Sequence, residues 1–591
     1  MASIVELKPG PKLHGRAFYE SLGSPKFVVA PMVDQSEFAW RMLTRSFLTP
    51  QENAKLLAYT PMFHARLFDE TPKYRDAHFQ ATRQPVGSPD VAGSTGLPFL
   101  DGNPGFDRPL FVQFCANDPE HLLHAAQLVA PYCDAVDLNL GCPQGIARKG
   151  HYGAFLQEDQ KLIYDLINIL HKNLPIPVTA KIRILETKED TLAYAKNVLS
   201  AGASILTVHG RRREQKGHLT GVADWGYIRY LRENLPRDTV IFANGNILQH
   251  EDIGKCLEAT GADAVMSAEG NLSDPSIFAA PPPPEQEGRE YWRGLDGKGG
   301  YRVDAVFRRY LDILHKYVLE QEPPKRRPLF VVGDDVAWLH DTEGAQDGDH
   351  EEGPARKKVK QNGASARSTS PNIVGVRPHL FHLLRHFISR HTDIRDMLAR
   401  TNPGDIAGVE KVLDMVERRV AQGLIDYERT GGKSVEEEEA ASKPKKKSTA
   451  AADPPKEEEE GKEGDADPDA DPEDDPESSV ATVKACKRPW WIAQPIVRPL
   501  PKEALAKGSI KMSKKDMKKQ AQAATADVST TLAAAVVVAD STIGNGTGSD
   551  KLAQNVEAGL PQADEKESGV QTPAIDPAAP ELTAHDDLVS G

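Results

Sequence analysis

Residues 137–156 read DLNLGCPQGIARKGHYGAFL, a short alternating run that ends abruptly in glycine, cysteine and proline. Two leucines alternate with two polar residues, Asp137 and Asn139, which is typical of a strand with two different faces. The strand stops at a Gly-Cys-Pro turn, and this turn carries Cys142. The stretch therefore predicts a buried strand that presents one thiol on a rigid turn at its end.

Short apolar runs of this kind recur eight times in the first 280 residues, and helical spacing fills most of the intervals. Alternation of strand and helix predicts parallel βα units, and eight units in about 250 residues is the size of a TIM barrel. We therefore predict an α/β fold with a (β/α)8 TIM barrel. A doubly wound sheet is the alternative, but the G-x-G-x-x-G turn that it requires after the first strand is missing. The eight runs are residues 27–32, 57–63, 110–115, 135–140, 178–184, 205–208, 240–243 and 264–267.

The active site of such a barrel lies at the C-terminal ends of its strands. Amides, cations and glycines collect at these ends. Glycines after strands seven and eight would let backbone amides approach a phosphate, and a buried lysine would stabilise an anionic reduced flavin. This set fits FMN better than a metal ion, because the one histidine has no ligand partner at metal spacing. The residues in strand order are Pro31, Met32, Val33, Gln113, Asn139, Cys142, Lys181, Arg183, His209, Asn244, Gly245, Asn246, Ala268 and Glu269.

An ordered set of motifs in this region resembles the tRNA-dihydrouridine synthase family, over roughly residues 25–280. The wording of YTPMFHA and SAEGNL is most similar to the eukaryotic branch that acts on positions 16 and 17 of the D-loop. The resemblance implies an enzyme that uses FMN and NAD(P)H to reduce the C5–C6 double bond of uridine in tRNA. The matching pieces are APM (30–32), QFCANDPE (113–120), DLNLGCPQ (137–144), KGHYGAFL (149–156), KIR (181–183), TVHGRRREQKG (207–217), FANGNI (242–247) and MSAEGNL (266–272).

The resemblance also implies roles for these residues. Cys142 would be the acid that protonates C5 of uracil, and Asn139 and Arg183 would hold the base. Glu269 departs from the family, because many members carry arginine there and a carboxylate repels phosphate, so it would bind through its backbone. The implied flavin neighbours are Pro31, Met32 and Val33, then Gln113 and Lys181 at the ring, and His209, Asn244, Gly245, Asn246, Ala268 and Glu269 at the ribityl phosphate.

Composition divides the 591 residues into a barrel and less regular parts. Helical spacing at 301–318, 378–400 and 405–423 predicts an all-helical domain after the barrel, and the resemblance gives it a role in tRNA binding. Two tryptophans in a polar tail suggest a docking segment. The expected parts are an N-terminal extension (1–24), the FMN-binding barrel (25–285), the helical domain (290–430) with a disordered insert at about 333–371, and a mostly disordered acidic tail (431–591) with the docking segment at 487–501.

Taken alone, the net charge of −14 argues against a nucleic-acid partner, but residues 431–480 hold 18 Asp/Glu and 7 Lys/Arg. We therefore expect basic residues of the rim, at 147–149 and 211–213, and the cations Lys325, Arg326 and Arg327 to meet tRNA phosphates. Protein partners of the tail stay open.

The five cysteines show no C-x-x-C spacing, and the sequence has no apolar leader and no long apolar run. We therefore expect a cytoplasmic or nuclear protein that binds neither a membrane nor a metal ion. Two other functions remain open: an FMN-barrel dehydrogenase of a free pyrimidine or dihydroorotate, and a non-catalytic tRNA-binding chaperone.

Overall fold

The computed structural model describes residues 12–83, 96–339, 370–435 and 479–506. One compact unit holds all of these up to Leu500, and a second unit contributes only the short helix α22 (Pro501–Ala506). Most of the expected disordered insert, the acidic run and the last part of the tail lie outside the described residues.

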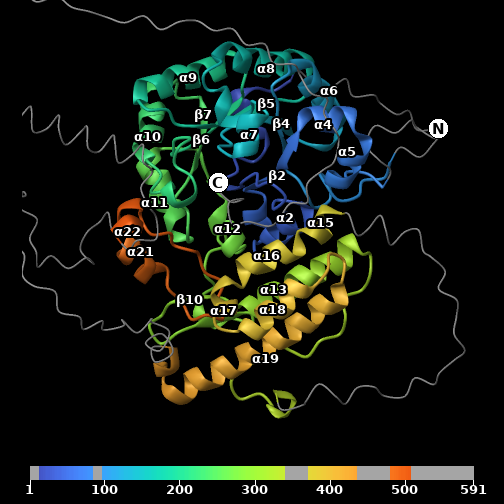
Figure 1. Cartoon of the computed structure of the whole chain (residues 1–591), viewed down its shortest axis with the longest axis vertical. Helices are drawn as coiled ribbons and strands as arrows, with labels where there is room; N and C mark the ends of the chain where they lie inside the picture. Colours follow the sequence, from blue (N-terminus) through green and yellow to red (C-terminus); the bar gives the residue numbers. More distant parts are fainter. Residues whose placement is uncertain (1–11, 84–95, 340–369, 436–478, 507–591) are drawn as a thin grey trace, which may run out of the picture. The chain divides into compact units, whose positions relative to one another are not determined.

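Eight parallel strands close into a barrel, because β1 pairs with both β2 and β8 (Figure 1). The TIM-barrel prediction is thus confirmed. The first strand is shorter than the expected 27–32, since it ends before Pro31, which has no N–H for a strand ladder. The strands are β1 (Phe27–Val29), β2 (Leu56–His64), β3 (Leu110–Cys115), β4 (Ala135–Leu140), β5 (Val178–Arg183), β6 (Ile205–His209), β7 (Val240–Asn244) and β8 (Ala264–Ser267).

Helices surround the strands, and several begin at a side-chain cap. Asp118, Asp159, Thr187 and Asp224 accept backbone N–H groups at the starts of α6, α8, α9 and α10. The elements around the strands are α1 (Gly15–Ser21), α2 (Phe38–Arg45), α3 (Pro50–Asn53), α4 (Ala65–Glu70), α5 (Pro72–His78), α6 (Pro119–Val129), η1 (Ala130–Tyr132), α7 (Gly145–Lys149), η2 (Gly153–Leu156), α8 (Gln160–Asn173), α9 (Lys188–Ser200), η3 (Gly217–Leu219), α10 (Trp225–Asn234), α11 (Glu251–Thr260) and α12 (Glu269–Ser273).

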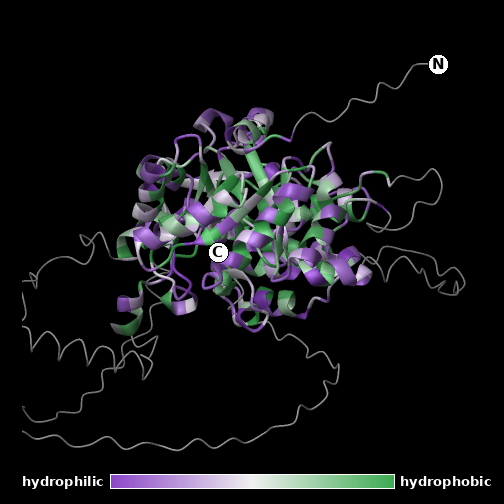
Figure 2. Cartoon of the chain, turned by 90° about the horizontal axis from the view of Figure 1, so that it is seen from above, coloured by the Kyte–Doolittle hydropathy of each residue, from purple (hydrophilic) through white to green (hydrophobic). Residues whose placement is uncertain are grey.

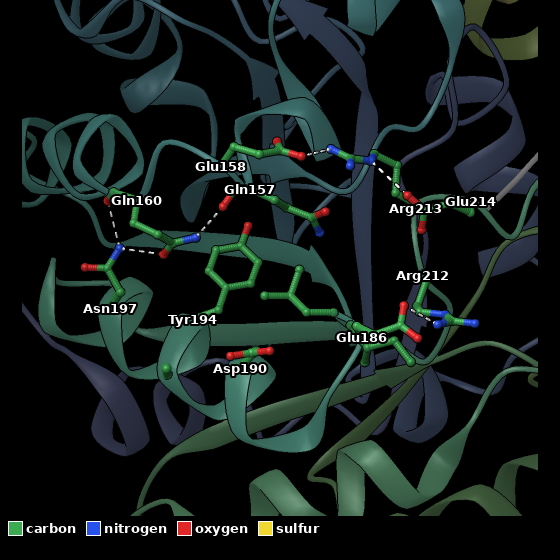
Figure 3. A pocket seen from close by; sticks show the side chains of 13 residues that line it. Gln157, Glu158, Gln160, Glu186, Asp190, Tyr194, Asn197, Arg212, Arg213 and Glu214 are labelled. Carbon is green, nitrogen blue, oxygen red and sulfur yellow. Dashed lines mark hydrogen bonds and ion pairs between the residues drawn. The ribbon is translucent and has the colours of Figure 1, made fainter. Parts of the chain in front are cut away.

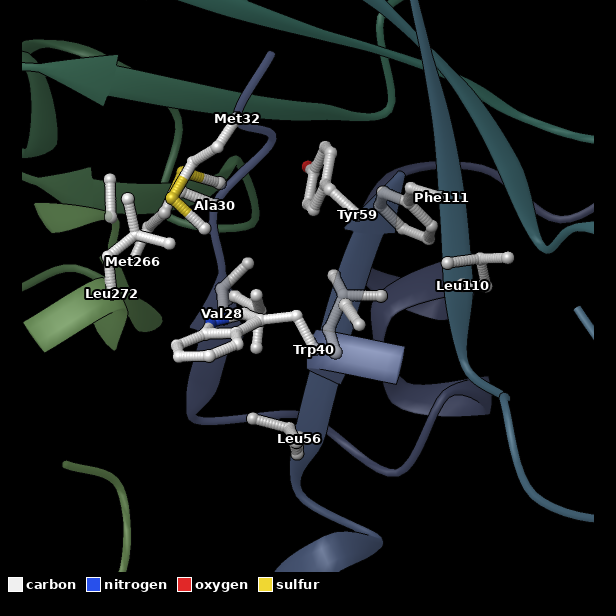
Figure 4. Close-up of a cluster of buried hydrophobic side chains, with 14 of the residues drawn as sticks. Val28, Ala30, Met32, Trp40, Leu56, Tyr59, Leu110, Phe111, Met266 and Leu272 are labelled. Carbon is white, nitrogen blue, oxygen red and sulfur yellow. The ribbon is translucent and has the colours of Figure 1, made fainter. Parts of the chain in front are cut away.

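The barrel strands are buried on both faces, as expected for a parallel sheet covered by helices. Figure 2 shows the helices striped in both colours, which fits amphipathic helices with one buried side. Val28, Tyr59 and Phe111 fill part of the core, and Met32 lies beside Met266 (Figure 4). Polar residues at the strand ends therefore sit on a rigid, close-packed support.

The region after the barrel is helical, as predicted, but it begins with a two-stranded hairpin. The helix expected over 378–400 is three helices, because the backbone leaves the helical conformation at Leu384 and again before α18. The elements are η4 (Pro284–Gln286), β9 (Tyr291–Arg293), β10 (Gly299–Tyr301), α13 (Val303–Ile313), the π-helical turn η5 (Leu314–Val318), η6 (Ala337–Leu339), α15 (Pro371–Val374), α16 (Val376–Leu383), α17 (Arg385–Ile388), α18 (Thr392–Arg400) and α19 (Ile406–Thr430).

The barrel and the helical region share one continuous hydrophobic core. The imidazole of His379 on α16 stacks on the indole of Trp40 on α2, with ring centroids 4.0 Å apart. Its Nε2 also donates to the carboxylate of Glu37 at 2.9 Å. A histidine with no exposed surface and a carboxylate hydrogen-bond partner in the barrel fixes α16 against the barrel.

The C-terminal segment, defined here as residues 479–500, begins with α21 (Ser479–Cys486) and then packs on the helical region. The backbone carbonyl of Trp491 accepts from the amide of Val303 at 2.9 Å, and Ala493 donates to the carbonyl of Tyr301 at the same distance. The indole of Trp491 is only 1% exposed. Most of the segment 487–501, expected to dock, thus packs against the hairpin and α13 of the same chain.

Candidate functional site

Parallel register brings the predicted polar residues together at the C-terminal ends of the strands. Asn139 on β4 pairs with Lys181 on β5, and further along β5 Arg183 pairs with His209 on β6. His209 in turn pairs with Asn244 on β7. Every one of these side chains is at most 9% exposed. Such a set of buried polar groups at the mouth of a barrel is costly for stability and is typical of a functional site.

The turn that carries Cys142 is held from three sides. Oδ1 of Asn139 accepts from the backbone amide of Cys142 at 2.9 Å. Arg183 Nε donates to the carbonyl of Gly141 at 2.7 Å, and Lys216 Nζ donates to the carbonyl of Pro143 at 2.7 Å. The sulfur therefore has a fixed position at the mouth.

Gly153 allows the following loop to approach this turn closely. Its φ is +65°, in the left-handed region that favours glycine, and a Cβ at this position would lie 2.9 Å from the Cβ of Cys142. Only glycine fits both the backbone conformation and the space. The loop thus packs directly against the cysteine.

A chain of buried hydrogen bonds leads to the same turn. Thr179 Oγ1 donates to Asp137 Oδ1 at 2.6 Å, and Gln113 Nε2 donates to Asp137 Oδ2 at 2.8 Å. Asn139 Nδ2 then donates to Gln113 Oε1 at 2.8 Å. The chain orients both amides, so that Asn139 presents its oxygen to the cysteine turn.

The thiol of Cys142 is suited to donate a proton. Burial raises its pKa, although the backbone amide of Gln144 and the nearby cations Arg183 and Lys181 partly offset this effect. A thiol whose pKa lies above its ordinary value stays protonated at neutral pH. Cys142 is also the most accessible of the five cysteines, since the other four are buried.

Lys181 is an unusual cation. Burial, with help from the neighbouring Arg183, lowers its pKa to about 7, and the nearby carboxylate of Asp137 acts in the opposite direction. Within the residues that the structure describes, its ammonium group donates no hydrogen bond. An anionic group at the barrel mouth would restore its charge, which is what a reduced flavin ring would supply.

Within the described ranges, one ring nitrogen of His209 has no hydrogen-bond partner. Its Nε2 accepts from Arg211 Nη1 at 3.0 Å, so the neutral ring carries its proton on Nδ1. Burial and the surrounding arginines and lysine lower its pKa well below the ordinary value, and it stays neutral. In the described part of the chain Nδ1 is buried and unpaired, as is Oδ1 of Asn244. A donor and an acceptor left unpaired here fit a ligand that carries both hydroxyls and a phosphate, as FMN does.

A cavity of about 300 Å³ opens beside these residues, at the ends of β7 and β8. Asn244, Gly245 and Asn246 line it from β7, and Ala268 and Glu269 line it from β8. The C-terminal segment closes another side with residues 496–498. Five of the six residues predicted at the phosphate end thus line one hollow, whereas His209 is not among its lining residues.

A larger hollow, of about 710 Å³, lies between α8, α9 and the loop after β6 (Figure 3). Its charged lining includes Glu158, Glu186, Asp190 and Glu214 against Arg212 and Arg213, which form ion pairs with glutamates. This acidic balance disfavours an anionic cofactor or RNA phosphate. It also means that two arginines of the rim run 211–213 are already paired within the chain.

The structure adds residues that sequence reasoning missed. Asp137 and Thr179 belong to the buried chain behind the cysteine turn, and the polar alternation in β4 was a usable signal for Asp137. Arg211 was assigned to RNA, but it bonds to His209, Asn246 and the carbonyl of Gly221. Arg498, far away in sequence, forms an ion pair with Glu269. No local signal could have found this last contact.

The described ranges contain neither a membrane-spanning helix nor a clustered set of metal ligands. No helix there is long and apolar enough to cross a membrane. No cluster of three or more His, Cys, Asp or Glu side chains in the same ranges could hold a metal ion.

A closed barrel with a buried polar mouth and a thiol after its fourth strand defines a TIM-barrel protein with an enzyme-like site. Comparison with known proteins goes further. The family model described as "Dihydrouridine synthase (Dus)" matches residues 28–292. This chain belongs to the dihydrouridine synthase family.

Relatives from three organisms are similar to this chain. The tRNA-dihydrouridine(16/17) synthase [NAD(P)(+)] of Saccharomyces cerevisiae is 46% identical over 391 residues, which cover 66% of this chain and 73% of that protein. The protein of the same name from Schizosaccharomyces pombe is 42% identical, with coverage of 70% and 82%. A mouse protein, named as like the same synthase, is 46% identical but covers only 45% of this chain and 51% of its own length.

Proposed function

We propose that this protein is a tRNA-dihydrouridine synthase that uses FMN and NAD(P)H to reduce uridine at positions 16 and 17 of the D-loop. The observation that carries the proposal is Cys142, a protonated thiol clamped by Asn139, Arg183 and Lys216 at the mouth of the barrel. Family membership and the names of the yeast relatives support the substrate and the reductant.

The residues at the mouth divide into those that hold the cofactor and those that act on the base. Gln113 and Lys181 would face the flavin ring, where Lys181 stabilises negative charge. The phosphate end would lie in the cavity of about 300 Å³. When bound, FMN would carry a hydride from NAD(P)H to C6 of the uracil. The remaining flavin neighbours are Pro31, Met32 and Val33 at the ring, and His209, Asn244, Gly245, Asn246, Ala268 and Glu269 at the ribityl phosphate.

The thiol of Cys142 supplies the matching proton to C5, and its thiolate takes a proton back from water. Its raised pKa keeps the acid form available at neutral pH. Asn139 Oδ1 and Arg183 Nε already bind the cysteine turn, so these residues would position the acid. The second hydrogen of Asn139 Nδ2 remains for a uracil oxygen.

The test is to identify the cofactor and the product. The purified full-length protein should show a flavin absorbance spectrum and release intact FMN on denaturation. With NADPH and unmodified tRNA, mass spectrometry of tRNA fragments should find two added hydrogens at positions 16 and 17.

The outcomes separate the three candidate functions. A flavoprotein that reduces free pyrimidines or oxidises dihydroorotate, and leaves tRNA unchanged, would favour the free-base dehydrogenase. A colourless protein that binds tRNA and cannot be reconstituted with FMN would favour the chaperone. Either result would overturn the proposal.

A further inference from the structure

The cavity beside β7 and β8 has few cations of its own. Loops after these two strands hold the phosphate in many barrels, through backbone amides and basic side chains. In this chain those loops place Gly245, Asn246 and Glu269 at the cavity, and Glu269 carries a negative charge. Among the cavity-lining residues that the structure describes, the cationic side chains are Arg211 and Arg498.

Arg211 is largely committed to the protein itself. Its guanidinium donates to His209 Nε2, to Asn246 Oδ1 and twice to the carbonyl of Gly221. Burial lowers its pKa to about 10, and the nearby charge of Arg498 acts in the same direction. Arg211 therefore organises the loops, and a second cation lies close to it.

Arg498 reaches the cavity from the C-terminal segment. Its Nε and Nη2 both donate to one oxygen of Glu269, at 3.0 and 2.8 Å. The side chain of Arg498 is 34% exposed, more than the 20% of Glu269. Glu269 thus fixes the direction of the guanidinium at the edge of the cavity, and the arginine offsets the charge that would repel a phosphate.

The segment that carries Arg498 is firmly anchored. Trp491 and Ala493 bond to the backbone of the helical region, and His386 Nε2 donates to the carbonyl of Pro495 at 3.2 Å. Residues on both sides of this anchor line the cavity, Ser479 and Thr482 before it and Ile496 and Val497 after it. The guanidinium is therefore held in place before any ligand arrives, which lowers the entropic cost of binding.

Resting on the proposed function, we infer that Arg498 is a binding residue for the cofactor phosphate, and that Glu269 positions it. Asn244 supports a ligand in the same cavity, since its side chain is 1% exposed and its Oδ1 has no partner in the described chain. A ribityl hydroxyl could donate to that oxygen while the phosphate meets Arg498. The cofactor site would then be complete only with the C-terminal segment in place.

The test compares FMN with riboflavin, which lacks the phosphate, by fluorescence titration of the cofactor-free full-length protein. Arg498→Ala should weaken FMN binding about 10- to 100-fold, the loss expected for a charge-assisted hydrogen bond, and leave riboflavin affinity unchanged. Arg498→Lys should keep part of the preference for FMN. Glu269→Gln keeps an acceptor and removes a repelling charge, so FMN affinity should hold or rise.

Arg488→Ala is the matched control, because this arginine of the same segment bonds to the carbonyls of Gly299 and Ala485 away from the cavity. An equal loss of FMN and riboflavin affinity in Arg498→Ala, with a lower melting temperature, would mean that the ion pair only fastens the segment. Unchanged affinity for both would equally overturn the inference. A wild-type protein that binds neither ligand would instead refute the proposed function.

Discussion

Asn139 clamps the turn of the reactive thiol: its side-chain oxygen accepts from the backbone amides of Gly141 at 3.1 Å and Cys142 at 2.9 Å. Its amide nitrogen donates to Gln113 at 2.8 Å, so one side chain connects the cysteine turn to the buried polar chain. The acid is therefore positioned by a residue two strand positions beyond Asp137.

Asn139→Ala should slow dihydrouridine formation while FMN binding stays near the wild-type level. The variant leaves two backbone amides unpaired at the turn, so the sulfur loses its fixed position. Asn139→Asp keeps the acceptor but loses the donor to Gln113, and should retain more activity than the alanine variant. The measurement is single-turnover reduction of tRNA with the reduced enzyme.

Asn117→Ala is a suitable control, since this exposed amide bonds to the carbonyl of Gly150 and not to the backbone of Gly141 or Cys142. If the Asn139→Ala and Asn117→Ala enzymes reduce tRNA at the same rate, the hydrogen bonds from the cysteine turn to Asn139 do not contribute to the reaction.

Cys142→Ala should bind FMN and accept electrons from NADPH, yet form almost no dihydrouridine. Loss of a positioned acid costs roughly 10²- to 10⁴-fold in rate. Because burial raises the thiol pKa, the wild-type rate should stay level through neutral pH and fall only at alkaline pH, when the thiol ionises. Rapid-mixing measurements can separate the NADPH and tRNA half-reactions.

Cys115→Ala removes a neighbouring, fully buried cysteine and serves as the matched variant. Full product yield from Cys142→Ala would show that another group donates the proton.

The sequence predicted the parts of this site that follow from strand periodicity. Asp137 and Asn139 alternate with leucines, and the Gly-Cys-Pro turn marks the strand end, so the place of Cys142 at the mouth could be inferred. The pair of Arg498 and Glu269 could not, because 229 residues separate the partners and the contact depends on how the C-terminal segment folds back. The broken helices after residue 376 were also missed, since apolar spacing continues across the breaks.

FMN affinity should depend on pH through Lys181. Its pKa of about 7 in the free protein means that the side chain is cationic below that pH and largely neutral above it. If the bound cofactor favours the cation, binding raises the pKa, and affinity is highest at low pH. It should fall above about pH 7 by at most tenfold per pH unit.

Lys181→Met should bind FMN more weakly and remove this part of the pH dependence, while any contribution from the phosphate itself remains. Titrations from about pH 6 to about pH 9 would test both proteins. Identical pH profiles for the two would exclude Lys181 as the titrating group.

Gly423→Ala should destabilise the protein, although alanine usually stabilises a helix interior by about 0.5–1 kcal/mol relative to glycine. A Cβ at this position of α19 would lie 2.7 Å from the ring of Trp490 and 3.0 Å from the ring of Trp491. The rings would have to move, and the C-terminal segment with them. Gly254→Ala is the control, because outside its own stretch of helix no atom of the described residues lies within 4 Å of a Cβ there. A higher melting temperature for Gly423→Ala would show that the tryptophans do not pack against α19 as described.

tRNA affinity should depend more on the barrel rim than on Arg326 and Arg327 of the helical region, although the sequence predicts phosphate contacts from both. Arg326 pairs with Asp312 and Glu410, and Arg327 with Asp414 and Glu417, so both already serve the helical region. Arg148 and Lys149, by contrast, are exposed at the end of α7, close after the cysteine turn.

Replacing both Arg148 and Lys149 by alanine should weaken tRNA binding. It should also reduce the salt dependence of the binding constant by the contribution of up to about two phosphate contacts. Arg326→Ala with Arg327→Ala should mainly lower the melting temperature, because it leaves carboxylates without their partners. Salt titrations of tRNA binding, with thermal melts of each variant, would distinguish the two effects. The opposite result would place the RNA contact in the helical region. In that case the variant lacking Arg326 and Arg327 would show a flatter salt dependence at an unchanged melting temperature, and the variant lacking Arg148 and Lys149 would bind tRNA like the wild type.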